Sequence, residues 1–240
     1  MKPFDLFADA LWDFYKTGKA NLRVERDDGY RGGEDIRWYF TRAAGFPAFE
    51  KRALKFARGK ILDLGCGAGR HSLHLQARGL RVTGVDASPR IVELARARGV
   101  QDARVADACG KMPFVKNEFD TVILFGNNLG ICGTLPRFRK MLRELHRITS
   151  PRGRIIATTR MPSTTRAVHR SYLRQNLERG RALGQVRVRL VYRGRRGVYF
   201  DLLLLAPTDL MQLAARAGWE LREVFGENLE EGYSVVLEKR

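Results

Sequence analysis

The chain has 240 residues, of which 44% are hydrophobic, and its formal net charge is +18. This size fits one large α/β domain, or one domain with a small insertion. The sequence has no apolar run near the roughly 20 residues of a membrane helix, and it begins without the apolar stretch of a secretion signal. The three cysteines form no C-x-x-C pair, so we expect a reducing, cytoplasmic location and no metal site.

The positive charge is carried mainly by arginine. Excess positive charge favours nucleic acid or acidic metabolites as partners. A GC-rich genome or a thermophilic surface gives the same composition, so charge alone keeps RNA open as a partner without selecting it.

The first 58 residues are predicted to form an N-terminal helical lid. Apolar residues recur at helical spacing over 1–20, and Gly18 is expected to end that helix. Residues 21–33 are polar and rich in glycine, which predicts a mobile loop. Two further helices are expected over 34–44 and 47–57.

Alternating strands and helices follow, which predicts a parallel α/β core over 59–160 and 207–240. Strands are expected at 61–64, 81–85, 103–106, 121–125, 154–159, 219–225 and 233–237, with helices at 70–78, 89–98, 135–148 and 207–217. Residues 161–206 interrupt this pattern with a basic helix at 163–180 and a hairpin made of 186–191 and 198–205. We expect this insertion to bind substrate.

The most informative motif is the glycine-rich turn after the first core strand. Gly65, Gly67 and Gly69 alternate with small residues, and Asp86 ends the next strand 21 positions after Gly65. Glycine lets the backbone pass close to a ligand. An acid at that reach accepts hydrogen bonds from both hydroxyls of a ribose, so the unit predicts a nucleotide site.

The spacing distinguishes between cofactors. A dinucleotide site needs G-x-G-x-x-G, but arginine stands at 70 and serine at 72. The pattern Asp63-x-Gly-x-Gly-x-Gly69 resembles the first motif of class I S-adenosylmethionine-dependent methyltransferases. Further matches over about 60–150 are Val-Asp86-Ala-Ser, Asp107-Ala and Phe119-Asp120-x-Val.

The resemblance implies a Rossmann-like, doubly wound sheet of seven strands in the order 3-2-1-4-5-7-6. The last two strands have no helix between them, as this fold requires. The implied cofactor is S-adenosylmethionine, with S-adenosylhomocysteine as product and no metal. The Gly-Asn pair after strand 121–125 is similar to that in small-molecule enzymes related to glycine N-methyltransferase.

The resemblance also implies roles for particular residues. Asp63 would hold the cofactor's ammonium directly or through water, Asp86 with Ala87 the ribose, and Asp107 with Ala108 the adenine. The backbone of Gly65, Cys66 and Gly67 would pack on the methionine and ribose, the Phe125 carbonyl would face the amino group, and Asn127 and Tyr39 would face the substrate.

The sequence names no catalytic base. His71, His74, Tyr15, Tyr30 and Tyr39 are candidates. Arginines at 166, 170, 174, 187 and 189 are candidates for receiving a carboxylate, a phosphate or RNA, or they form a solvated face. Cys132 lacks the neighbouring proline of a methylating cysteine, and we expect it to be structural.

Three functions therefore stay open. The first is methyl transfer to a small molecule, for which an anionic acceptor fits the arginines. The second is methylation of RNA through the basic surface. The third is a non-catalytic subunit that binds S-adenosylmethionine. The sequence makes no prediction of oligomeric state.

Overall fold

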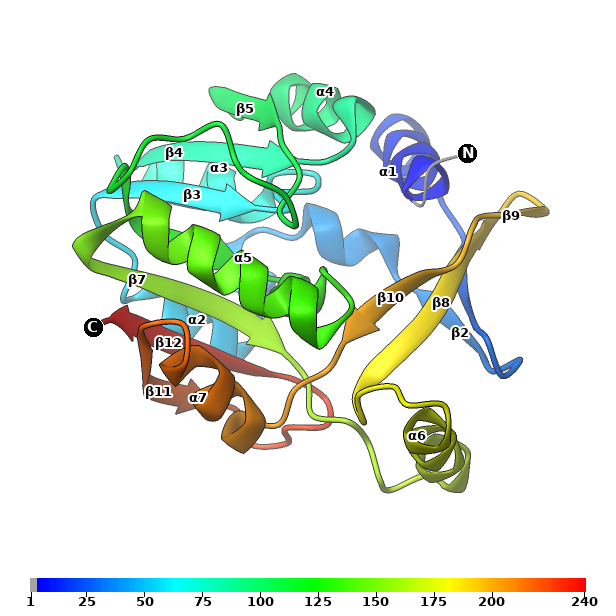
Figure 1. The fold of residues 1–240 in the computed structure, drawn as a ribbon. Coiled ribbons are helices and arrows are strands. Elements are labelled where there is room, and N and C mark those ends of the chain that lie inside the picture. Colours follow the sequence, from blue (N-terminus) through cyan, green and yellow to red (C-terminus); the bar gives the residue numbers. More distant parts are fainter. Residues whose placement is uncertain (1–3) are drawn as a thin grey trace.

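The computed structural model describes residues 4–240. Over this range it contains a central sheet of seven strands and a second sheet of five, with helices around the first (Figure 1). The central sheet runs β5 (Asp102–Val105), β4 (Arg81–Asp86), β3 (Lys60–Leu64), β6 (Phe119–Leu124), β7 (Thr149–Thr159), β12 (Tyr233–Lys239) and β11 (Trp219–Phe225). The predicted α/β, Rossmann-like architecture is confirmed.

The first five of these strands are parallel, and β12 runs antiparallel to both of its neighbours, β7 and β11. The central strands are apolar on both faces because helices cover both sides. Ile61, Ile123 and Ile156 pack on one side, whereas Leu62 and Leu124 pack on the other.

Two pairs of helices account for most of this cover. The first side carries α2 (Ala48–Leu54) and α3 (Arg70–Ala77), and the opposite side carries α5 (Leu135–Ile148) and α7 (Pro207–Ala215). Helix α4 (Pro89–Ala97) packs beside β5. Among residues 4–240, none of these helices is long and apolar enough to cross a membrane.

The second sheet corrects the prediction for the N-terminal segment. Residues 21–33 do not form a mobile loop: β1 (Leu22–Arg26) and β2 (Arg31–Glu34) are paired strands. Strand β1 also pairs with β8 (Gln185–Tyr192) of the insertion, which in turn pairs with β10 (Phe200–Leu203) and the short β9 (Arg195–Arg196). The predicted lid is therefore not purely helical, because its central part is ordered by a partner strand more than 150 residues away.

The helix predicted over 34–44 is also wrong. The chain there forms two short 3₁₀ turns, η1 (Ile36–Phe40) and η2 (Ala43–Gly45), with Thr41 in an extended conformation between them. The Asp35 carboxylate accepts from the Arg37 N–H and starts the first turn. Phe46 precedes Pro47, and that position disfavours helical backbone, which ends the second turn.

Other predicted elements are confirmed with small shifts. Helix α1 (Asp5–Thr17) ends at Gly18, whose N–H donates to the Phe14 carbonyl; its predicted start at 1–3 lies outside the described residues. Helix α6 (Ala167–Glu178) lies in the insertion. Helix α1 packs on α4, where the Trp12 indole N–H donates to the Arg90 carbonyl at 2.9 Å.

Candidate functional site

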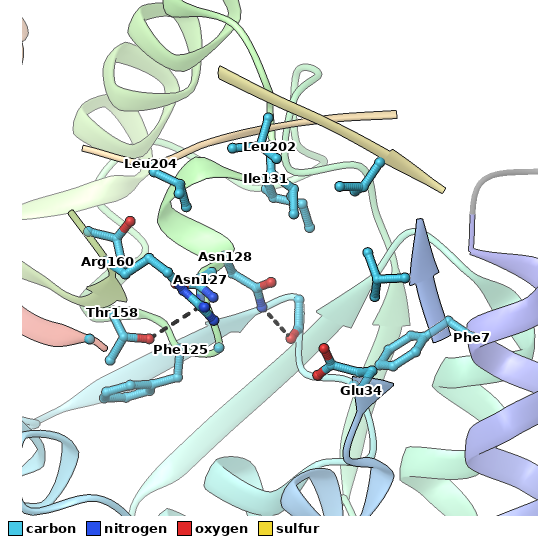
Figure 2. Close-up of a pocket in the computed structure, with 18 of the residues that line it drawn as sticks. Phe7, Glu34, Phe125, Asn127, Asn128, Ile131, Thr158, Arg160, Leu202 and Leu204 are labelled. Atoms are coloured by element: carbon cyan, nitrogen blue, oxygen red, sulfur yellow. Dashed lines mark hydrogen bonds between the residues drawn. The ribbon is translucent and has the colours of Figure 1, made fainter. Parts of the chain in front are cut away.

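The glycine-rich turn after β3 is held by a side chain from another strand end. Gly65 has a φ of +76°, and a Cβ there would collide with the Asn128 amide. That amide instead donates to the Leu64 carbonyl at 3.2 Å. It also donates to the Gly65 carbonyl at 2.8 Å (Figure 2). These hydrogen bonds therefore hold the turn after β3 against the segment after β6.

Asp86 at the end of β4 is fixed by two backbone donors. Its Oδ2 accepts from Gly67 N–H at 3.3 Å, and its Oδ1 accepts from Ser88 N–H at 3.0 Å. Burial raises the pKa of Asp86 to about 6. Asp86 and Ala87 line the same cavity as Gly65, Cys66 and Gly67.

Asp107 and Ala108, after β5, also line this cavity. The Asp107 carboxylate accepts from the Cys109 N–H at 2.9 Å. Cys109 forms a disulfide with Cys132. The sequence analysis expected reduced cysteines, because the three cysteines form no C-x-x-C pair, and the Cys109–Cys132 bond goes against that expectation. The bond gives Cys132 a structural role and ties the loop after β5 to the segment after η3 (Asn128–Gly130).

The segment after β6 contributes Phe125 and Asn127 to the cavity. Asn127 has a φ of +66°, and its N–H donates to the Thr158 hydroxyl at 3.4 Å (Figure 2). The Phe125 carbonyl accepts from Asn128 N–H at 3.4 Å, and its ring lies 4.3 Å from that of His71.

Asp63 lies differently from its predicted position. It is 2% exposed, and it is not among the described residues that line the cavity. Its Oδ2 accepts from the Ser72 hydroxyl at 2.7 Å, and burial raises the pKa of its carboxyl. The structure therefore places Asp63 in contact with α3, behind the turn. Cys66 does line the cavity, and burial raises the pKa of its thiol well above the usual value.

Tyr39 reaches the cavity from the N-terminal segment. Its hydroxyl donates to Glu34 at 2.8 Å, and its ring lies 4.8 Å from that of Phe7. Burial, followed by the charge of Glu34, raises the pKa of Tyr39 well above 10. A Cβ added to Gly67 would lie 3.9 Å from this ring, so Tyr39 covers the glycine turn.

The five candidate bases differ in whether they line the cavity. His71, Tyr30 and Tyr39 line the cavity, whereas His74 and Tyr15 are not among its described lining residues. His71 Nε2 lies 3.2 Å from Glu50, which also forms an ion pair with Arg70 at 2.9 Å. Glu50 was missed by sequence reasoning because its partners lie 20 and 21 positions away, on another helix.

The predicted arginine row is corrected. Val186, Val188 and Leu190 of β8 line the cavity; Arg187 and Arg189 point to the other face of the second sheet and are not among the described lining residues. Arg189 pairs with Glu25 at 2.9 Å. Of the three arginines on or next to α6, only Arg166 is among the described lining residues.

The cavity has a volume of about 1780 Å³. Pockets for one small molecule are typically about 300–1,000 Å³, so two ligands fit side by side. The carboxyl ends of β3, β4, β5 and β6 form one wall, where ligands bind in open α/β sheets. The apolar face of the second sheet forms another. Within residues 4–240, no cluster of His, Cys, Asp and Glu is arranged to hold a metal ion.

Comparison with known proteins gives a consistent result. A family model described as "Methyltransferase domain" matches residues 61–153. Malonyl-[acyl-carrier protein] O-methyltransferase of Erwinia billingiae is 33% identical over 129 residues, which are 53% of this chain and 44% of that protein. Demethylmenaquinone methyltransferase of Thermotoga maritima is 28% identical over 110 residues, 45% of this chain and 46% of that protein. The chain thus spans less than half the length of these curated relatives.

A solved structure matches over the whole chain. It is a SAM-dependent methyltransferase from Bacteroides fragilis in complex with S-adenosyl-L-homocysteine. The two chains are 28% identical with a TM-score of 0.82, and the match covers 100% of this chain and 97% of that one.

Proposed function

Because the chain belongs to the class I S-adenosylmethionine-dependent methyltransferases, we propose that it transfers the cofactor's methyl group to a small-molecule acceptor. One observation carries the proposal. The Asp86 carboxylate and the backbone of Gly65 to Gly67 face one cavity, which has room for a second ligand beside a nucleoside.

The residues at the strand ends fit the cofactor's chemistry. Asp86 already accepts two backbone N–H groups, and each carboxylate oxygen keeps a lone pair for a ribose hydroxyl. Asp107 has one oxygen engaged by Cys109 N–H, which leaves the other to accept from an adenine amine. Ala108 N–H would donate to a ring nitrogen.

The methionine end would lie at Gly65, Cys66 and Phe125. The Phe125 carbonyl would accept from an amino group there, and the buried Asp63 would act through the field of its carboxylate rather than by contact. Asn127 and Tyr39 would border the acceptor. When bound, S-adenosylmethionine supplies a methyl group on a positively charged sulfur.

The chain's own contribution is mainly positioning. Two hydrogen bonds hold the strand ends in one arrangement: Asn128 donates to Gly65, and Gly67 donates to Asp86. Positioning of reactants in this way lowers the activation free energy by on the order of 7–11 kcal/mol in favourable cases. His71 is held by Glu50 and stacked on Phe125, which suits it to shape the cavity.

The test is calorimetry followed by an assay of methyl transfer. S-Adenosylmethionine and S-adenosylhomocysteine should bind in the micromolar range, whereas NAD should not. Purified protein should then transfer labelled methyl groups to members of a small-molecule panel. Preferential binding of NAD would overturn the assignment of the cofactor, and a purified chain that binds cofactor but turns over only with a partner would support a non-catalytic subunit.

RNA methylation is the second candidate, and the net charge of +18 favours it. Helix α5 exposes Arg137, Arg139, Lys140 and Arg143. Phosphate contacts would make RNA affinity fall steeply with salt. An absence of RNA binding at low salt would end this alternative.

A further inference from the structure

The second sheet presents an apolar face to the cavity. Its inward side chains pair across the strands as Val24 with Leu190, Val188 with Phe200, and Val186 with Leu202. All six residues line the cavity. They come from both the N-terminal segment and the insertion, so neither segment forms this wall alone.

Further apolar side chains extend this wall around the cavity. Ile131, Leu202 and Leu204 lie together on one side, and Phe7 of α1 lies on another (Figure 2). Burying a methylene group against such a surface contributes about 0.8 kcal/mol. The wall therefore favours a ligand with an extended hydrocarbon body over a polar metabolite.

Arg160 supplies a cation at the edge of this apolar region. It follows β7 directly, and its side chain extends into the cavity toward the segment of Asn127 (Figure 2). Among residues 4–240, no carboxylate lies within ion-pair distance of its guanidinium. Its positive charge acts on Tyr39 across the cavity and lowers the pKa of the tyrosine against the larger, raising effect of burial.

Two of the acids that line the cavity accept hydrogen bonds from neighbouring groups. Glu34 accepts from the Tyr39 hydroxyl. Glu230 accepts from the hydroxyls of Ser163 and Thr165 and from Thr164 N–H, contacts that lower the pKa of Glu230 to about 2. Arg160 has no such partner among residues 4–240, so its guanidinium can bind an anionic group of a ligand.

We propose that the acceptor is an amphiphilic carboxylate, with its carboxylate on Arg160 beside Asn127 and its hydrocarbon body along the apolar face of the second sheet. The inference rests on the proposed function and specifies its acceptor. Arginine suits this role because its planar guanidinium matches a carboxylate with two parallel hydrogen bonds.

Calorimetry with straight-chain probes tests this proposal. Octanoate, decanoate and dodecanoate are titrated with and without saturating S-adenosylhomocysteine, and decylamine serves as the cationic counterpart. Affinity for the carboxylates should rise about fourfold for each added methylene. Decanoate should bind at least tenfold more tightly than decylamine.

Two exposed or half-buried positions provide the variants. Arg160→Gln should weaken decanoate binding about tenfold and remove the preference over decylamine. Leu202→Trp should weaken dodecanoate more than octanoate, because the larger ring shortens the apolar wall. The control, Arg187→Gln, alters the opposite face of the second sheet and should change neither.

The outcomes separate the two levels of inference. The affinity for S-adenosylhomocysteine should stay unchanged in all three variants. A wild-type protein that does not bind S-adenosylhomocysteine would contradict the proposed function itself. Carboxylate affinity that is independent of chain length, equal to that of decylamine, or unaffected by Arg160→Gln would overturn the acceptor class while leaving the cofactor site intact.

Discussion

The backbone N–H of Gly67 donates to Oδ2 of Asp86 at 3.3 Å. This contact joins the glycine turn after β3 to the acid that ends β4. The same carboxylate also holds Ser88 N–H, at the start of α4. A change at Asp86 therefore affects both the proposed ribose contact and the geometry of two neighbouring loops.

Replacing Asp86 is expected to weaken cofactor binding strongly. Asp86→Ala leaves two ribose hydroxyls without an acceptor, which should cost about 2–4 kcal/mol, measured by calorimetry with S-adenosylhomocysteine. The matched control is Glu93→Gln on the exposed side of α4, which should bind like the wild type. Equal affinity in Asp86→Ala would remove this residue from the site.

Cofactor affinity should also depend on pH through Asp86. Burial raises the pKa of its carboxyl from 3.8 to about 6, and the ionised form is the one that accepts from both hydroxyls. Affinity should be constant above pH 7 and should fall toward tenfold per unit below about pH 6. Asp86→Asn should flatten that decline, and a wild-type profile that is level down to pH 4 would contradict the assignment.

The local part of this site was predictable from sequence, and the long-range part was not. Gly65 follows β3, Asp86 ends β4 and Asp107 lies just after β5, and parallel strands bring their carboxyl ends to one edge. The contact of Asp63 with Ser72 depends instead on how α3 packs behind the turn, and a motif does not specify packing.

The second sheet shows the same limit more clearly. The alternation in β8 separated Val188 from Arg187 and Arg189 correctly, but alternation does not tell which face meets a cavity. That choice is made by β1, which pairs with β8 across more than 150 residues. The role proposed for Arg160 likewise became visible only once its surroundings were known.

Gly65→Ala tests whether the Asn128 hydrogen bonds hold the glycine turn. The new Cβ would meet the Asn128 amide at a φ of +76°, so the turn would lose the hydrogen bonds to Leu64 and Gly65. Gly79→Ala is the control, because its φ is +78° and nothing lies within 4 Å of its Cβ. Both variants carry about 1–2 kcal/mol of backbone strain, and Gly65→Ala should lose about 1–3 kcal/mol more in urea unfolding. Equal stabilities would mean that Asn128 does not hold the turn.

The Cys109–Cys132 disulfide should stabilise the fold. For cysteines 23 positions apart, restriction of the unfolded chain gives about 3 kcal/mol. The double variant Cys109→Ser, Cys132→Ser should therefore unfold at lower urea, and dithiothreitol should shift the wild type but not the variant. If the reductant moves both equally, or neither, the bond is not a source of stability.

Glu50 is expected to be the most sensitive buried acid outside the residues proposed to bind cofactor. Its side chain is 4% exposed, that of Arg70 is 11% exposed, and they form an ion pair at 2.9 Å. Glu50→Gln keeps the volume but leaves the arginine charge uncompensated, which typically costs about 3–5 kcal/mol. Urea unfolding followed by circular dichroism measures the loss, with the exposed Glu223→Gln on β11 as the control.

Because Glu50 also contacts His71 at 3.2 Å, the variant should disturb the cavity wall and weaken cofactor binding even where it remains folded. Unchanged stability would show that Arg70 finds water or another partner, and the contacts of Glu50 would then be incidental to the fold.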